Sequence, residues 1–105
     1  MKITFDSNRR TFALDCTEMS YVISITDDGR LANLYWGGAV HDVSDCDGVR
    51  AALVCEPHPS FGMKTRPEYR TGEAFDYGIP CLRATLADGA QTLRVRYASH
   101  EINGD

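Results

Sequence analysis

The stretch "SYVISITDDGRLANLYWGG", Ser20–Gly38, decides the fold class that the sequence predicts. Two segments rich in β-branched and aromatic residues flank an Asp-Gly pair, and Gly29 accepts the positive φ that a tight turn requires. In the first segment the apolar residues recur at every second position, which is the period of a β-strand. The stretch therefore predicts a β-hairpin over residues 20–36.

The same two-residue alternation occurs elsewhere in the chain. "KITF" at the start predicts a short strand that leads into a second one, "TFALDC". Near the other end, Cys81–Leu86 and Gln91–Tyr97 flank "ADGA", which predicts a second hairpin around another Asp-Gly turn. "DGVRAALV" fits either a helical turn or a strand, and the proline- and glycine-rich Glu56–Pro80 predicts an irregular loop.

About six or seven strands are expected in total, and no segment predicts a long helix. The fold class is therefore all-β: an antiparallel β-sandwich, part of a larger supersandwich, with little or no helix. Nothing in the composition divides the chain, so residues 1–105 are expected to form a single domain.

The bulk charge and hydropathy exclude some classes of partner. The net charge is −4, which disfavours binding to a phosphate backbone. The longest strictly apolar run, Ala51–Cys55, is too short for a membrane span, and the first residues lack a signal-peptide core. We expect a soluble protein that is cytoplasmic if Met1 is the native start.

No metal site or cofactor is predicted. Four cysteines, none with C-x-x-C spacing, are typical of reduced thiols rather than a zinc site. The acids after His41 suggest a calcium loop, but with Gly48 at the sixth position Val43 and Val54 would occupy ligand positions. Asp42, Asp45 and Asp47 are therefore expected to lie in a solvated turn.

No catalytic residue is predicted either. His41, His58 and His100 are isolated, and no G-x-S-x-G elbow is present for a hydrolytic triad. An arginine-rich strand face near the C-terminus, Arg83 with Arg94 and Arg96, could bind an anion. The solvent side of a half-buried sheet explains these arginines as well, and we prefer that interpretation.

Aromatic residues gather in the middle of the chain and are the one suggestive group. Flat rings stack on the apolar faces of sugars, and Trp and Tyr also carry a hydrogen-bonding group. Trp36 and Tyr69 are therefore the candidates for carbohydrate contact. The alternative is that a single Trp in a small β domain belongs to the core or to an interface.

A set of short motifs, taken together and in order, resembles the N-terminal β-sandwich domain of family 36 glycoside hydrolases, the bacterial α-galactosidases. The matching positions are Ser20-Tyr21, Gly29, Leu31, Leu34-Tyr35-Trp36-Gly37, Glu68-Tyr69, Gly72, Phe75, Pro80, Asp88-Gly89, Arg96-Tyr97, Ser99-His100 and Ile102. They extend over nearly the whole chain. The segment Asp42–Arg66 departs from the family pattern: it is shorter and lacks an Asp and an Arg that reach a neighbouring subunit in tetrameric members.

The resemblance implies a part of a larger enzyme. Such enzymes carry a (β/α)8 barrel whose two aspartates hydrolyse α-galactosides with retention, and a barrel needs about 200 residues or more. The chain is thus expected to be a non-catalytic scaffold for a barrel of the same polypeptide. Binding of α-galactoside sugars is expected through the parent enzyme. Exposed sheet edges could also pair copies of the chain. The alternative function is a free-standing carbohydrate-binding module.

Overall fold

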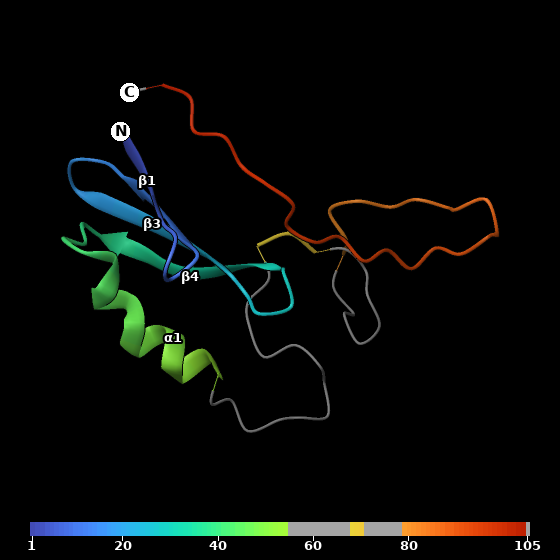
Figure 1. The fold of residues 1–105 in the computed structure, drawn as a ribbon, viewed down its shortest axis with the longest axis horizontal. Helices are drawn as coiled ribbons and strands as arrows, with labels where there is room; N and C mark the ends of the chain where they lie inside the picture. The colour runs from blue at the N-terminus through green and yellow to red at the C-terminus, as the bar shows by residue number, and fades with distance from the viewer. Residues whose placement is uncertain (55–67, 71–78, 105) are drawn as a thin grey trace.

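The computed structural model describes residues 1–54, 68–70 and 79–104. Four strands form one antiparallel sheet in the order β1-β2-β3-β4, so each strand pairs with its neighbour in the sequence (Figure 1). The strands are β1 (Lys2–Asp6), β2 (Thr11–Asp15), β3 (Met19–Ile25) and β4 (Leu31–Gly38). A 3-10 helix, η1 (Val43–Cys46), and an α-helix, α1 (Asp47–Val54), follow.

The first predicted hairpin is confirmed. β3 and β4 pair antiparallel around a turn in which Gly29 has φ 81° and its N–H donates to the Thr26 carbonyl at 2.9 Å. Asp28 also forms an ion pair with Arg30 Nε at 2.8 Å. The ladder contains a β-bulge: Val22 lies opposite Tyr35 and the next residue, Ile23, lies opposite Asn33, so Leu34 is the extra residue.

The all-β class is confirmed, with one short helix. "DGVRAALV" is the helix α1, which decides between the two interpretations left open by its sequence. Within the described ranges there are four strands in one sheet rather than six or seven. Most of the expected loop Glu56–Pro80 lies outside those ranges.

The turn of the second predicted hairpin is confirmed, whereas the prediction of its two strands is wrong. Gly89 has φ 84° and donates to the Leu86 carbonyl at 2.9 Å, yet neither flank forms a strand. Most of the two flanks projects away from the sheet in Figure 1, although the Tyr97 N–H donates to the Gly29 carbonyl at 2.7 Å, and Leu82, Leu86 and Val95 are exposed. A two-stranded ribbon without a sheet to pack against is marginally stable, which explains the missing ladder.

The two faces of the sheet differ in side-chain size. The covered face lies under η1 and the start of α1, and its residues are nearly all buried: Thr11, Ala13, Ser20, Val22, Ser24, Ala32 and Leu34. Cys46 packs on Ala13, Val22 and Leu34 to form the core. The aromatic face carries the larger side chains, which are mostly half-buried or exposed: Ile3, Phe5, Phe12, Leu14, Tyr21, Ile23 and Trp36.

Candidate functional site

Trp36 lies on the aromatic face of β4 with 72% of its surface exposed. Its cross-strand neighbour is Tyr21 on β3, and the two rings meet edge to face with centroids 6.1 Å apart and an interplanar angle of 87°. Cross-strand aromatic pairs of this kind stabilise a sheet and favour this geometry over face-to-face stacking. The contact with Tyr21 orients the indole while leaving most of its surface accessible.

Glu68 joins this pair from a distant part of the chain. Its N–H donates to the Leu31 carbonyl at 2.8 Å, which fixes the backbone of residue 68 beside the start of β4. Its carboxylate accepts a short hydrogen bond from the Tyr21 hydroxyl. Burial raises the pKa of Tyr21, the hydrogen bond to Glu68 raises it further, and a hydrogen bond with the Asn33 side chain partly offsets the rise.

These side chains line an open depression of about 550 Å³, which we call the Trp36 pocket: Met19, Tyr21, Asn33, Trp36 and Glu68. The volume is within the range of small-molecule sites. Its floor is aromatic and sulfur-containing, whereas the Glu68 carboxylate and the Asn33 amide supply hydrogen-bonding groups. Such a lining suits a ligand with one apolar face and several hydroxyl groups.

Of the two predicted sugar contacts, only Trp36 lines this pocket. Tyr69 is 44% exposed, but its neighbour Glu68 is the residue that reaches the depression. Sequence reasoning missed Glu68 because nothing local connects residue 68 to β3. The pairing of Tyr21 with Trp36 could have been found only by placing the bulge, which shifts the register of β4 by one residue.

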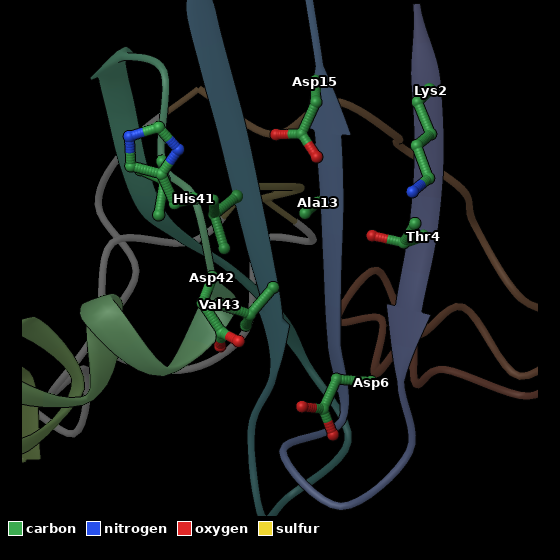
Figure 2. A pocket seen from close by; sticks show the side chains of 10 residues that line it. Lys2, Thr4, Asp6, Ala13, Asp15, His41, Asp42 and Val43 are labelled. Atoms are coloured by element: carbon green, nitrogen blue, oxygen red, sulfur yellow. The ribbon is translucent and has the colours of Figure 1, made fainter.

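A second pocket, of about 250 Å³, opens on the covered face between β1, β2 and the segment before η1 (Figure 2). Its labelled side chains include Lys2 and Thr4 from β1, Asp15 from β2, and His41. Asp15 accepts a hydrogen bond from Ser20 Oγ at 2.7 Å. The other acids of this region serve turns and helix ends, so the pocket has no set of carboxylates pointing at one centre.

The acids that suggested a calcium loop stabilise local structure. Asp42 caps η1 by accepting from the Ser44 N–H at 2.7 Å, and Asp47 accepts from Arg9 Nε at 3.0 Å. Hydrogen bonds with Ser44 lower the pKa of Asp42, and the hydrogen bond from the Arg9 side chain lowers that of Asp47. Among the described residues no group of three or more His, Cys, Asp or Glu could hold a metal ion.

The remaining candidates are separated in space. His41 lies at the second pocket, and His58 falls outside the described ranges. His100 packs on the aromatic face, with its ring centroid 4.3 Å from that of Phe5 and 4.8 Å from that of Phe12. Arg83, Arg94 and Arg96 are exposed, but their segments form no strand, so the prediction that they lie on the solvent side of a half-buried sheet is wrong.

The described part of the chain contains no helix long and apolar enough to cross a membrane. The thiols of Cys16, Cys46 and Cys81 are free, and that of Cys46 is buried. Burial raises the pKa of Cys46, which makes it a poor nucleophile.

The known proteins that are similar to this chain in sequence or in structure are α-galactosidases. No protein-family model matches the chain. The chain is 31% identical over 112 residues to the α-galactosidase AgaA of Geobacillus stearothermophilus, a match that covers 97% of this chain and 15% of AgaA. The curated relatives that it matches are thus much longer, and the chain spans about 15% of their length.

The solved structures that are similar to this chain are also α-galactosidases. The family 36 α-galactosidase AgaB of the same organism has a TM-score of 0.70 and 29% identity, over 96% of this chain and 14% of AgaB. A variant of AgaA solved in complex with raffinose has a TM-score of 0.64 and 30% identity, over 87% of this chain and 14% of that one.

Proposed function

Because the chain is homologous to the N-terminal region of the family 36 α-galactosidases, we propose that it is the non-catalytic amino-terminal domain of an enzyme of this kind. The observation that carries the proposal is a match over nearly the whole chain that spans only about 15% of each relative. In this function residues 1–105 form one domain of a longer polypeptide. Its partner is a catalytic (β/α)8 barrel in the same polypeptide, which hydrolyses terminal α-galactosides with retention.

A scaffold of this kind needs surface that other parts of the enzyme can cover. The aromatic face supplies it, because Met19 and Trp36 are exposed there while Phe5 and Phe12 are only half-buried. Apolar surface of this kind marks a contact site.

Activity measurements test the scaffold function. The 105-residue chain should not hydrolyse an aryl α-galactoside, whereas the reading frame continued past Asp105 should encode a barrel and give turnover. Turnover by the short chain that disappears when one of its own acids, such as Asp15, is replaced by Asn would contradict the proposal.

The sheet edges support pairing of copies. β1 and β4 are the outer strands of the sheet, and outer strands present backbone groups to other chains. Light scattering should show dimers at high protein concentration. A strict monomer over the accessible concentration range would exclude this mode of association.

A second candidate function is direct carbohydrate contact through Trp36 and Tyr69. It is favoured by the exposure of both rings, 72% and 44% respectively. Titration with galactose or raffinose should change the fluorescence of Trp36, the single tryptophan of the chain. A constant spectrum up to high sugar concentration counts against it.

We also propose that the protein is cytoplasmic. The free thiols of Cys16, Cys46 and Cys81 are typical of a reducing compartment. Fractionation of the source cells tests this, and recovery in an extracellular fraction would contradict it.

A further inference from the structure

We propose that two copies of this chain join through β1, which pairs antiparallel with β1 of the second copy about a two-fold axis at Thr4. The inference rests on the pairing of copies proposed above and adds the edge and the register to it. Ile3 lies opposite Phe5 of the second copy, and Lys2 lies opposite its Asp6. Two four-stranded sheets thus become one continuous antiparallel sheet.

The ladder between β2 and β3 determines which backbone groups of β1 face outward. At one end of this ladder the Ile25 N–H donates to the Arg10 carbonyl at 2.9 Å, and at the other end the Cys16 N–H donates at 2.8 Å. Its acceptor is the Met19 carbonyl, and both pairs continue the register of the two strands. Hydrogen bonds alternate along an antiparallel strand. Even-numbered residues of β2 therefore bond to β3, and odd-numbered residues bond to β1.

The free edge of β1 is formed by the backbone of Ile3 and Phe5. Lys2, Thr4 and Asp6 are the partners of the odd-numbered residues of β2. The N–H and C=O groups of Ile3 and Phe5 consequently point away from the sheet. Among the described residues, no backbone group outside the sheet hydrogen-bonds to them. They offer the donors and acceptors that an added antiparallel strand needs.

The other outer strand, β4, is a poorer template. The Glu68 N–H already donates to the Leu31 carbonyl at 2.8 Å, so one acceptor of that edge is occupied. The bulge at Leu34 also interrupts the regular spacing of the outward groups. By contrast, β1 pairs with β2 along its whole length without a register shift. The edge of β1 is therefore both free and regular.

The charges of β1 select the register. Pairing about Thr4 matches the whole strand and sets Lys2 of each copy opposite Asp6 of the other, on the covered face. Opposite charges at directly opposed positions stabilise a sheet. A register centred on Ile3 or on Phe5 would pair fewer residues and separate these charges. Lys2 is exposed and forms no ion pair within the described part of its own chain.

The Asp6 carboxylate has room for this contact. It accepts from the Arg9 N–H at 2.9 Å and from Arg9 Nη1 at 3.1 Å, and its side chain is 25% exposed. A carboxylate has about four acceptor positions, so others remain open to a lysine. Lys2 also faces Asp15 across its own β1–β2 ladder, so the joined edges place each ammonium between two carboxylates.

Amide exchange followed by NMR tests which edge is used. In the dimer the Ile3 and Phe5 amides should exchange at least ~10-fold more slowly than in the diluted monomer, because hydrogen bonding protects them. The Thr4 amide already bonds to β2 and is the internal control, which should change far less. Protection on dimerisation at Asn33 of β4, and not at Ile3 and Phe5, would overturn the assignment to β1 and leave the pairing of copies standing.

Two variants separate the backbone contribution from the charge contribution. Ile3→Pro removes an outward N–H that β2 does not use, so the chain should keep its circular dichroism spectrum and stay monomeric by light scattering. Lys2→Glu opposes like charges at two places and should weaken the dimer by ~10-fold. Arg94→Glu changes the net charge equally and is the matched control, with the affinity of the parent. Parent-like dimers of Ile3→Pro would overturn the edge, and those of Lys2→Glu the register.

A disulfide tests the two-fold axis. Thr4 faces its own copy in a non-hydrogen-bonded pair, where Cα atoms lie ~4.5 Å apart and a disulfide can form. With Cys16, Cys55 and Cys81 replaced by Ser, Thr4→Cys should cross-link two copies on oxidation. Lys2→Cys lies on the same face away from the axis and should not. Equal cross-linking of the two variants would overturn the axis. A strictly monomeric parent would overturn this inference and the pairing of copies together, whereas the non-catalytic domain function would stand.

Discussion

The guanidinium of Arg50 connects α1 to the covered face of the sheet by hydrogen bonds. Its Nη1 donates to Ser24 Oγ at 2.6 Å and its Nη2 donates to Thr11 Oγ1. Thr11 is fully buried and Ser24 nearly so. Polar side chains are tolerated there because Arg50 donates to both, and a planar guanidinium presents its donors in a fixed fork that suits two neighbouring acceptors.

Replacing Arg50 should therefore be costly. Arg50→Met keeps an apolar stem but leaves two buried hydroxyls without this donor, and we expect a loss of about 1–3 kcal/mol in the free energy of unfolding. Urea denaturation measures it. The exposed Arg94→Met is the control and should change stability by less than about 0.5 kcal/mol. Equal effects of the two substitutions would show that the hydrogen bonds of Arg50 contribute nothing.

Substitution of two glycines by Ala should change the stability of the fold in opposite directions. Gly29 has φ 81°, and an added Cβ would approach Arg96 Cδ to 3.3 Å, so Gly29→Ala should destabilise the fold by about 1 kcal/mol or more. At Gly48, in the first turn of α1, an added Cβ meets nothing within 4 Å. Gly48→Ala should instead stabilise by up to about 1 kcal/mol. The midpoints of thermal unfolding of the two variants, compared with that of the parent chain, test both predictions. A higher midpoint for Gly29→Ala would contradict the turn geometry.

At the scale of elements, Arg9 links the β1–β2 turn to the start of α1. Its side chain forms ion pairs with Asp6 at 3.1 Å and with Asp47 at 3.0 Å. The pKa of Asp6 is lowered mainly by the Arg9 backbone N–H, and that of Asp47 mainly by the Arg9 side chain. The turn and the helix thus share one cation, although they lie far apart in the sequence.

This link makes stability depend on acid pH. A carboxyl whose folded pKa is lowered stabilises the fold above its unfolded pKa of 3.8, and that contribution is lost as pH falls through the folded value. The urea midpoint should therefore fall between about pH 5 and about pH 2. Arg9→Gln should show a smaller fall, because Asp47 loses the side-chain hydrogen bond that lowers its pKa, whereas the backbone N–H of residue 9 still lowers the pKa of Asp6. An identical pH profile in both proteins would refute the link.

Alternation in the sequence predicted the strands of the first hairpin but not which side would be buried. The larger residues, such as Tyr21 and Ile23, suggest one face for the core. The structure buries the other, because the small residues Ala13 and Ser20 allow η1 and the segment before it to approach closely. Ser20 Oγ is satisfied there by Asp15 and by the Val40 N–H, partners that no local pattern identifies.

At the scale of the whole molecule, the fold class and the Asp-Gly turns followed from local rules, whereas long-range partners did not. Trp36 could be singled out from composition, because it is the one tryptophan. Glu68 could not, because its role comes from a backbone bond to Leu31 across 37 residues of sequence. The strands predicted around Asp88-Gly89 did not form, because periodicity does not state whether a sheet is available.

The buried thiol of Cys46 reports on the integrity of the whole core. Cys16 and Cys81 are exposed, whereas Cys46 is 2% exposed with a raised pKa. In a Cys55→Ser background, a thiol reagent should modify Cys16 and Cys81 rapidly and Cys46 only when the core opens. Three equally fast reactions would contradict the packing of η1 on the sheet.

The His100 imidazole, which packs on the adjacent rings of Phe5 and Phe12, also offers a spectroscopic signature. Two phenyl ring currents act on its carbon-bound protons, and the protons of the Tyr97 ring lie nearby because its hydroxyl is 2.7 Å from His100 Nδ1. The imidazole resonances should therefore be shielded relative to those of a free histidine, and Phe12→Leu should relax that shielding. The chemical shift of one imidazole proton would then report whether the segment around His100 is packed on Phe5 of β1.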